Sequence, residues 1–149
     1  MSETLRPALP KELDERAEAL MKRVCEAGLK IATAESCTGG LLASLLTDIE
    51  GAGHGFDRGF VTYESSAKQQ MLGLTVELTD RNDAVTSAVA RAMAEGALQK
   101  SGADIAMSVT GFAGPAAPGR WSRGWHLNAA SSVAQSWIPW PLPRRSASP

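Results

Sequence analysis

The stretch A-E-S-C-T-G-G, residues 34–40, decides the fold of this chain. A short apolar run at residues 29–34 precedes it, and an amphipathic run at residues 41–49 follows it. This order predicts a strand, a tight glycine turn and a helix, with Ser36 and Thr38 at or just before the helix N-terminus. Unpaired N–H groups and the helix dipole favour anionic oxygen at such a place. A hydroxyl there can bind a phosphate, stabilise an oxyanion or act as a nucleophile.

Outward from this turn, signals for helices and strands alternate along the chain. Apolar residues at helical spacing predict the helices, and short apolar or alternating runs predict the strands. Alternation of the two indicates an α/β fold, a three-layer sandwich with a mostly parallel sheet. The expected helices are residues 11–26, 41–49, 65–72 and 84–100, the expected strands are residues 29–34, 59–63 and 104–109, and a glycine loop is expected at residues 110–115.

Composition narrows the class of protein and its partners. A net charge of −1 argues against bulk affinity for nucleic acid or for an anionic membrane. No apolar run approaches the roughly 20 residues that span a bilayer, and the N-terminal residues lack the apolar core of a signal peptide. Two cysteines fit a reducing cytoplasm, and two histidines without metal-ligand spacing predict no metal site. We therefore expect a soluble cytoplasmic protein.

The composition changes sharply toward the C-terminus. Residues 1–118 have the character of an α/β domain, whereas residues 119–149 contain four arginines, no lysine and all four tryptophans. Alternating Pro139, Pro141 and Pro143 oppose both a helix and a central strand. The bias is typical either of an interaction segment or of an out-of-frame reading of a GC-rich gene, so we expect this tail to be disordered or foreign to the fold.

Ser36 needs a base that removes its proton before it can act as a nucleophile. His54 lies in a glycine loop and His126 in the atypical tail, so a Ser-His-Asp triad has little support. Lys68 can serve instead if desolvation lowers its pKa. If residues 59–63 pair with residues 29–34, Lys68 and Tyr63 reach the carboxyl edge of the sheet together with Ser36.

The third expected strand delivers further polar groups to the same edge. Thr110, Gly111 and Gly114 offer hydroxyl and N–H donors for a phosphate or an oxyanion. Each candidate also has a plainer interpretation, in which the residue has only a structural role. Ser36 or Thr38 caps the helix, Glu35 holds the turn through backbone N–H groups, Lys68 is a solvated charge, Tyr63 packs, and the glycines only form a turn.

Three motifs carry a resemblance to a known family. They are A-E-S-C-T-G-G, R-G-F-V-T-Y-x-x-x-A-K (residues 58–68) and S-V-T-G-F-A-G-P (residues 108–115), in this order. Over about residues 10–118 the chain resembles the C-terminal domain of competence/damage-inducible protein CinA. Members of that family include nicotinamide-nucleotide amidases.

The resemblance implies hydrolysis of the carboxamide of nicotinamide mononucleotide to nicotinate mononucleotide and ammonia, in pyridine nucleotide salvage. It implies no cofactor and no metal, with Ser36 as nucleophile, Lys68 as base and Tyr63 as the assisting hydroxyl. Other residues at matching positions would shape the pocket for the amide and the phosphorylated ribose. These substrate-binding candidates are Thr38, Gly39, Gly40, Thr110, Gly111 and Gly114.

Beyond residue 118 the remaining strands and the final helix of the family pattern are missing or replaced, so no arginine is carried over from there. Two alternatives to an active amidase stay open: a non-catalytic module that binds a nucleotide or a protein, and an inactive product with a damaged C-terminus. A sheet face left uncovered would favour a homo-oligomer.

Overall fold

The computed structural model describes residues 9–79, 85–112 and 126–133. Within these ranges the helices are α1 (Lys11–Glu26), α2 (Leu41–Thr47), α3 (Ser65–Leu72), α4 (Val76–Thr79) and α5 (Ser87–Gln99), with the 3-10 turn η1 (Gly53–Gly55), and the strands are β1 (Ile31–Glu35), β2 (Phe56–Val61), β3 (Ile105–Phe112) and β4 (His126–Val133). The strand order is β2-β1-β3-β4, with β1 parallel to both β2 and β3 and β4 antiparallel to β3. No helix in the described ranges is long and apolar enough to cross a bilayer.

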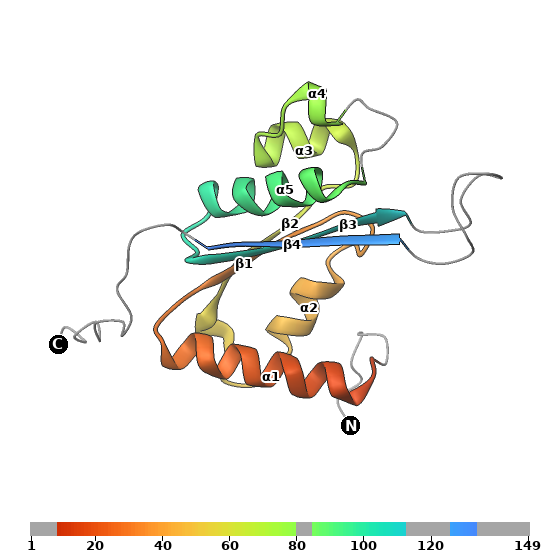
Figure 1. Ribbon diagram of the computed structural model, residues 1–149. Helices are drawn as coiled ribbons and strands as arrows, with labels where there is room; N and C mark the ends of the chain where they lie inside the picture. The colour runs from red at the N-terminus through yellow and green to blue at the C-terminus, as the bar shows by residue number, and fades with distance from the viewer. Residues whose placement is uncertain (1–8, 80–84, 113–125, 134–149) are drawn as a thin grey trace.

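Helices cover both faces of this sheet. Figure 1 shows α1 and α2 on one side and α3, α4 and α5 on the other, so the molecule has three layers. The α/β sandwich with a mostly parallel sheet is therefore confirmed. Its layers follow from the rule that parallel strands need helical crossovers, which bury both faces of the sheet.

Strand β1 is the centre of the core. All five of its residues are buried, and their side chains alternate between the two faces. Ile31 packs with Met21 and Val24 of α1, whereas Ala34 packs with Val89 and Met93 of α5. A fully buried aliphatic side chain stabilises a fold by about 1.5–3 kcal/mol. The contacts of β1 with α1 and with α5 therefore hold both helical layers against the sheet.

Strand β3 is longer than the sequence predicts. We expected it to end at residue 109 and a glycine loop to follow, but β3 continues through Phe112. Thr110 and Gly111 therefore lie on the strand and pair with Asn128 and Leu127. Pairing with β4 extends the strand over these residues and overrides the low strand propensity of glycine. Gly114 lies outside the described residues.

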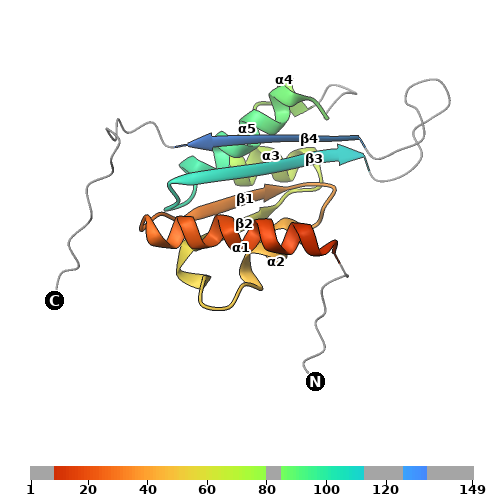
Figure 2. The same ribbon diagram turned by 60° about the horizontal axis from the view of Figure 1, so that its bottom comes forward.

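Strand β4 corrects our expectation for part of the tail. Residues 126–133 pair with β3 along their whole length, from Phe112↔His126 to Ile105↔Val133, and the two strands run side by side in opposite directions (Figure 2). An open strand edge offers N–H and C=O groups to any extended segment, whatever its hydrophobic pattern. The rest of residues 119–149 lies outside the described ranges.

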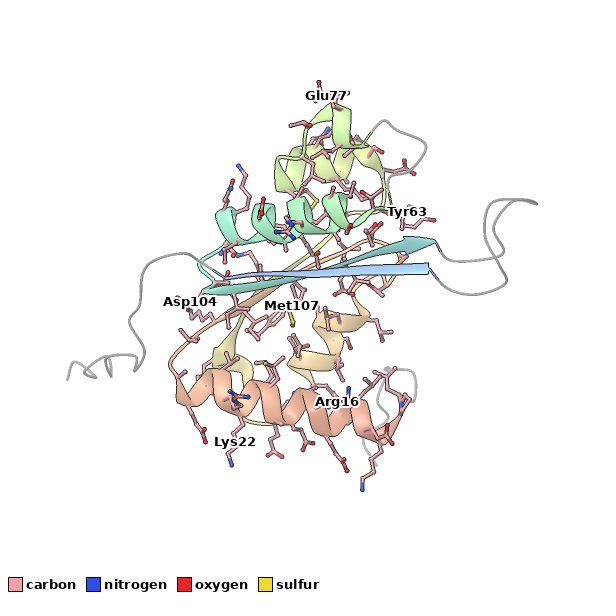
Figure 3. All side chains as sticks on the ribbon, viewed as in Figure 1. Arg16, Lys22, Tyr63, Glu77, Asp104 and Met107 are labelled. Atoms are coloured by element: carbon pink, nitrogen blue, oxygen red, sulfur yellow. The ribbon has the colours of Figure 1, made fainter. Side chains whose placement is uncertain are left out.

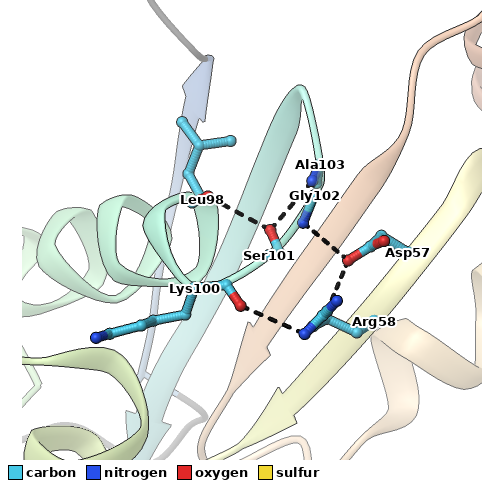
Figure 4. A network of polar contacts seen from close by, with 7 residues as sticks. All are labelled: Asp57, Arg58, Leu98, Lys100, Ser101, Gly102 and Ala103. Carbon is cyan, nitrogen blue, oxygen red and sulfur yellow. Dashed lines mark hydrogen bonds and ion pairs between the residues drawn. The ribbon is translucent and has the colours of Figure 1, made fainter.

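A polar network holds the amino-terminal edge of the sheet together (Figure 4). The Asp57 carboxylate accepts hydrogen bonds from Arg58 Nε at 2.7 Å and from the Gly102 N–H at 3.2 Å. Arg58 also donates to the Lys100 carbonyl at 3.4 Å, which joins β2 to the turn between α5 and β3. The hydrogen bond from Arg58 lowers the pKa of Asp57 below its usual 3.8.

Candidate active site

The turn after β1 is held by a buried carboxylate. Glu35 is fully buried, and its oxygens accept from the Leu42 N–H at 2.9 Å and the Ala43 N–H at 2.8 Å. The Leu41 N–H donates to the Thr38 carbonyl at 3.1 Å. The first three N–H groups of α2 are thus occupied by the chain itself. The anionic oxygen expected at this helix start is therefore supplied by Glu35, as in the interpretation in which Glu35 holds the turn through backbone N–H groups.

Neither neighbouring hydroxyl caps α2. The N-cap residue is Gly40, without a side-chain hydrogen bond, and the Thr38 hydroxyl is buried without a partner among the described residues. Gly39 and Gly40 have φ angles of 60° and 102°, a region that glycine adopts most readily, so the G-G pair favours the turn. The role of Glu35 leaves Ser36 available for chemistry.

Ser36 is placed in register with one residue on each of the two neighbouring strands. It is only 6% exposed, and its N–H donates to the Val109 carbonyl at 3.0 Å. The Thr62 N–H donates to the Glu35 carbonyl at 2.7 Å. These bonds continue both parallel ladders by one residue beyond β1, so the registers place Ser36 between Thr62 and Thr110.

Alternation of side chains tells which layer these residues face. Ala34 and Phe60 pack into the cluster formed with α5, and the Ser108 hydroxyl donates to a carbonyl of α5 at 2.6 Å. Two residues further along each strand, the side chains return to the same face. The residues at those positions are Ser36, Thr62 and Thr110, and the alternation predicts that they face the layer of α3 and α5.

Lys68 belongs to that layer. It lies one helical turn before Leu72, which packs in the core with α5, and it is only 4% exposed. Its Nζ donates to the Tyr63 carbonyl at 2.8 Å, at the end of β2. Burial lowers the pKa of Lys68 from its usual 10.5, with Glu64 and Cys37 acting in the opposite direction. The plainer interpretation of Lys68 as a solvated charge is wrong.

Cys37, in the turn after β1, interacts electrostatically with Lys68. The charges of Lys68 and Cys37 influence each other, and Cys37 is adjacent to Ser36 in the chain. Burial is the main cause of the raised pKa of Cys37, so its thiol is a poor nucleophile at neutral pH. Within the described ranges Lys68 Nζ is hydrogen-bonded to the Tyr63 carbonyl and not to Ser36, so proton transfer between Ser36 and Lys68 stays a prediction.

Tyr63 contributes differently from the sequence expectation. Its side chain is 69% exposed and extends outward at the carboxyl edge of the sheet (Figure 3). Its backbone carbonyl, rather than its hydroxyl, contacts Lys68. A purely packing role does not fit this exposure, and the assisting role of its hydroxyl stays a prediction.

Two threonine hydroxyls are buried on the strands on either side of Ser36. Thr62 and Thr110 are fully buried, and neither Oγ1 has a hydrogen-bond partner among the described residues. Leaving such a group unsatisfied costs about 1–3 kcal/mol, so each hydroxyl is available to a polar ligand or a water. Thr110 was predicted from the sequence, whereas Thr62 was missed. The signal was the two-residue period in G-F-V-T-Y, which puts Thr62 on the same face as Phe60.

Two further features do not add to this site. Among the residues described, no group of three or more His, Cys, Asp or Glu side chains is arranged to hold a metal ion. A cavity of about 460 Å³ lies between α1 and the turn after α2, where Lys22, Cys25 and Ala52 are among its lining residues. It contains none of the predicted site residues.

Comparison with known proteins gives consistent matches. The profile of the family described as "CinA C-terminal domain" matches residues 13–129. A putative competence-damage inducible protein of Symbiobacterium thermophilum is 52% identical over 98 residues, covering 66% of this chain and 23% of that protein. A CinA-like protein of Akkermansia muciniphila is 50% identical over 98 residues, covering 66% and 24%. The match thus spans about a quarter of the length of these relatives.

Solved structures match over more of the chain. The competence/damage inducible protein CihA from Agrobacterium tumefaciens has a TM-score of 0.75 and 39% identity, covering 89% of this chain and 78% of that one. A CinA superfamily protein from Escherichia coli has a TM-score of 0.68 and 30% identity, covering 87% and 82%. The likeness therefore includes both the fold and the sequence.

Proposed function

Since the chain belongs to the CinA C-terminal domain family, we propose that it is an amidohydrolase that converts nicotinamide mononucleotide into nicotinate mononucleotide and ammonia. The observation that carries the proposal is Lys68, a buried lysine of α3 with a lowered pKa, whose Nζ donates to the Tyr63 carbonyl just beyond β2. A serine nucleophile without histidine requires a base of this kind. The substrate follows from the resemblance of the three motifs.

The first half of the reaction forms an acyl-enzyme. Neutral Lys68 accepts the proton of the Ser36 hydroxyl while Oγ forms a bond to the carboxamide carbon. The C–N bond then breaks, and the nitrogen leaves as ammonia after taking the proton back from Lys68. The nicotinoyl group of the nucleotide remains on Ser36 as an ester.

The second half returns the enzyme to its starting state. Water gives a proton to Lys68 and attacks the ester carbon, the bond to Ser36 Oγ breaks, and Ser36 takes the proton from Lys68. The product is the carboxylic acid, which ionises at neutral pH. Tyr63 supplies its assisting hydroxyl from the outer rim of the site.

Backbone and hydroxyl donors around Ser36 would hold the substrate. The turn before α2 and the end of β3 surround the reacting centre with small residues, so that a flat ring and a phosphorylated ribose can approach the backbone closely. These substrate-binding candidates are Thr38, Gly39, Gly40, Thr110, Gly111 and Gly114.

Release of ammonia from nicotinamide mononucleotide by the full chain tests the proposal. Ser36→Ala should reduce the rate at least about a thousandfold, because no other group can form the ester. Cys37→Ala is the matched control, and it should keep the activity because the thiol next to Ser36 takes no part.

Three results would contradict the proposal in different ways. Undiminished turnover by Ser36→Ala would remove Ser36 as the nucleophile, and loss of turnover in Cys37→Ala alone would transfer the role to the thiol. A ligand-induced rise in melting temperature without any ammonia would favour the alternative of a non-catalytic nucleotide-binding module.

A further inference from the structure

We infer that Thr62 contacts the substrate, and that its hydroxyl and that of Thr110 hydrogen-bond the carboxamide from the two sides of Ser36. The inference rests on the proposed function and gives a role to Thr62, a residue of the second motif to which the resemblance assigned none. Its basis is a pair of fully buried hydroxyls without partners among the described residues, one on each strand next to Ser36.

The sheet register places Thr62 and Thr110 at equivalent positions on the two strands next to β1. Glu35 pairs with Val61 on β2 and with Val109 on β3, and the next residue on each strand is a threonine. Neighbouring strands lie about 4.8 Å apart, so the register puts one threonine on either side of Ser36, and the inference places the carboxamide between their hydroxyls.

The chemistry of a primary carboxamide matches two hydroxyls. Its carbonyl oxygen only accepts hydrogen bonds and its NH₂ group only donates them, whereas a threonine hydroxyl does both. One threonine can therefore donate to the oxygen while the other accepts from the nitrogen. In a buried site both hydrogen bonds are stronger than in water. A ligand group without the carbonyl oxygen or without the NH₂ would leave one threonine hydroxyl unsatisfied.

The effect of a Thr62 substitution on stability distinguishes a substrate contact from a structural role. In the free protein the Thr62 hydroxyl makes no hydrogen bond to any residue the structure describes. Its replacement by the methyl group of valine removes an unsatisfied polar group, so the variant should unfold at the same temperature or a higher one. A structural threonine would instead lower the unfolding temperature when changed.

The chain provides a matched control in Thr33. Its hydroxyl is also fully buried without a partner among the described residues. Thr33 shares a strand face with Ile31, which packs against α1, so its side chain lies on the opposite face of the sheet from Ser36. Thr33→Val therefore makes the same chemical change away from the carboxamide.

The test compares Thr62→Val, Thr62→Ser and Thr33→Val in the full chain, with kcat/KM for nicotinamide mononucleotide and the thermal unfolding temperature as readouts. Thr62→Val should lower kcat/KM about five- to tenfold, the loss of one hydrogen bond, without lowering the unfolding temperature. Thr62→Ser keeps the hydroxyl and should restore most of the rate. Thr33→Val should leave kcat/KM unchanged.

The contrary outcomes are separable. If the unchanged chain is active and Thr62→Val matches it, or if Thr33→Val loses as much, the inference about Thr62 is wrong and the proposed function stands. If kcat/KM and unfolding temperature fall together in Thr62→Val, and Thr62→Ser does not restore the rate, Thr62 is structural. If the unchanged chain neither binds nor hydrolyses the nucleotide, the proposed function and the inference both fail.

Discussion

At the scale of single residues, Glu35 determines what its neighbour Ser36 can do. The N-terminus of a helix ordinarily attracts a hydroxyl or a ligand anion, but here a buried carboxylate accepts the N–H groups of Leu42 and Ala43. The serine is thereby kept at the end of β1 without serving as a helix cap.

Glu35→Gln tests this role. The amide can accept only one of the two N–H bonds and turns its own NH₂ toward the other, so the free energy of unfolding should fall by about 1.5–3 kcal/mol. Denaturant unfolding measures the change. The control is Glu15→Gln in the exposed ion pair with Lys11 at 3.3 Å, which should change stability by less than about 0.5 kcal/mol. Equal effects of the two changes would contradict the role of Glu35.

Lys68 makes the activity depend on pH in a defined direction. Burial lowers its pKa below 10.5, and only the neutral amine can act as a base. We expect kcat/KM to rise with pH up to the lowered pKa and then to level off. Lys68→Arg should be inactive at every pH, because a guanidinium does not lose its proton. A wild-type profile that falls as the pH rises would refute this assignment.

The same pKa has a consequence for folding. Between the lowered folded-state pKa and 10.5, the unfolded chain binds more protons at this position than the folded chain, so Lys68 makes stability rise with pH in that window. Lys68→Met should remove this rise, as urea unfolding at a series of alkaline pH values would detect.

At the scale of elements, the position of α3 depends on one glycine of α5. A Cβ at Gly96 would fall inside van der Waals distance of the Leu72 carbonyl oxygen, so the two helices touch through the backbone there. Leu72 and Lys68 are one turn apart on α3. The close approach therefore also sets where the amine of Lys68 lies.

Gly96→Ala should destabilise the protein by about 1–3 kcal/mol although alanine is the better helix former, and it should lower activity because α3 must shift. Gly102→Ala is the control, since its Cβ would meet Asp57 Oδ1 at an ordinary 3.5 Å. Thermal unfolding of both variants checks this. A Gly96→Ala protein as stable as the parent chain would show that α3 and α5 are not packed so closely.

Some of the helices and strands could be predicted from the sequence, and others could not. The strand and helix on either side of the turn at residues 34–40, and the helices α1, α3 and α5, were predictable, because glycine punctuation and apolar periodicity are local signals. The extension of β3 and the existence of β4 were not, because a strand formed by pairing at an edge depends on a distant partner. For the same reason the layer faced by Thr62 became clear only from the register.

At the scale of the whole molecule, β4 joins part of the tail to the sheet. All eight of its residues pair with β3. Backbone amides in such a ladder exchange slowly with solvent, because they open only when the sheet does. Because β4 is at the edge of the sheet and, among the described strands, pairs only with β3, hydrogen exchange of the full chain should protect the alternate amides of residues 126–133 that bond to β3. Exchange at the rate of an unfolded peptide would instead support the interpretation of a tail that is foreign to the fold.

The most direct measurement of the central claim is acid quenching of the chain during turnover of nicotinamide mononucleotide, followed by mass spectrometry of its peptides. We predict that a nicotinoyl-nucleotide ester will be found on Ser36, and that it persists in a Cys37→Ala variant. An acyl group on Cys37, or turnover without any covalent adduct, would contradict the account.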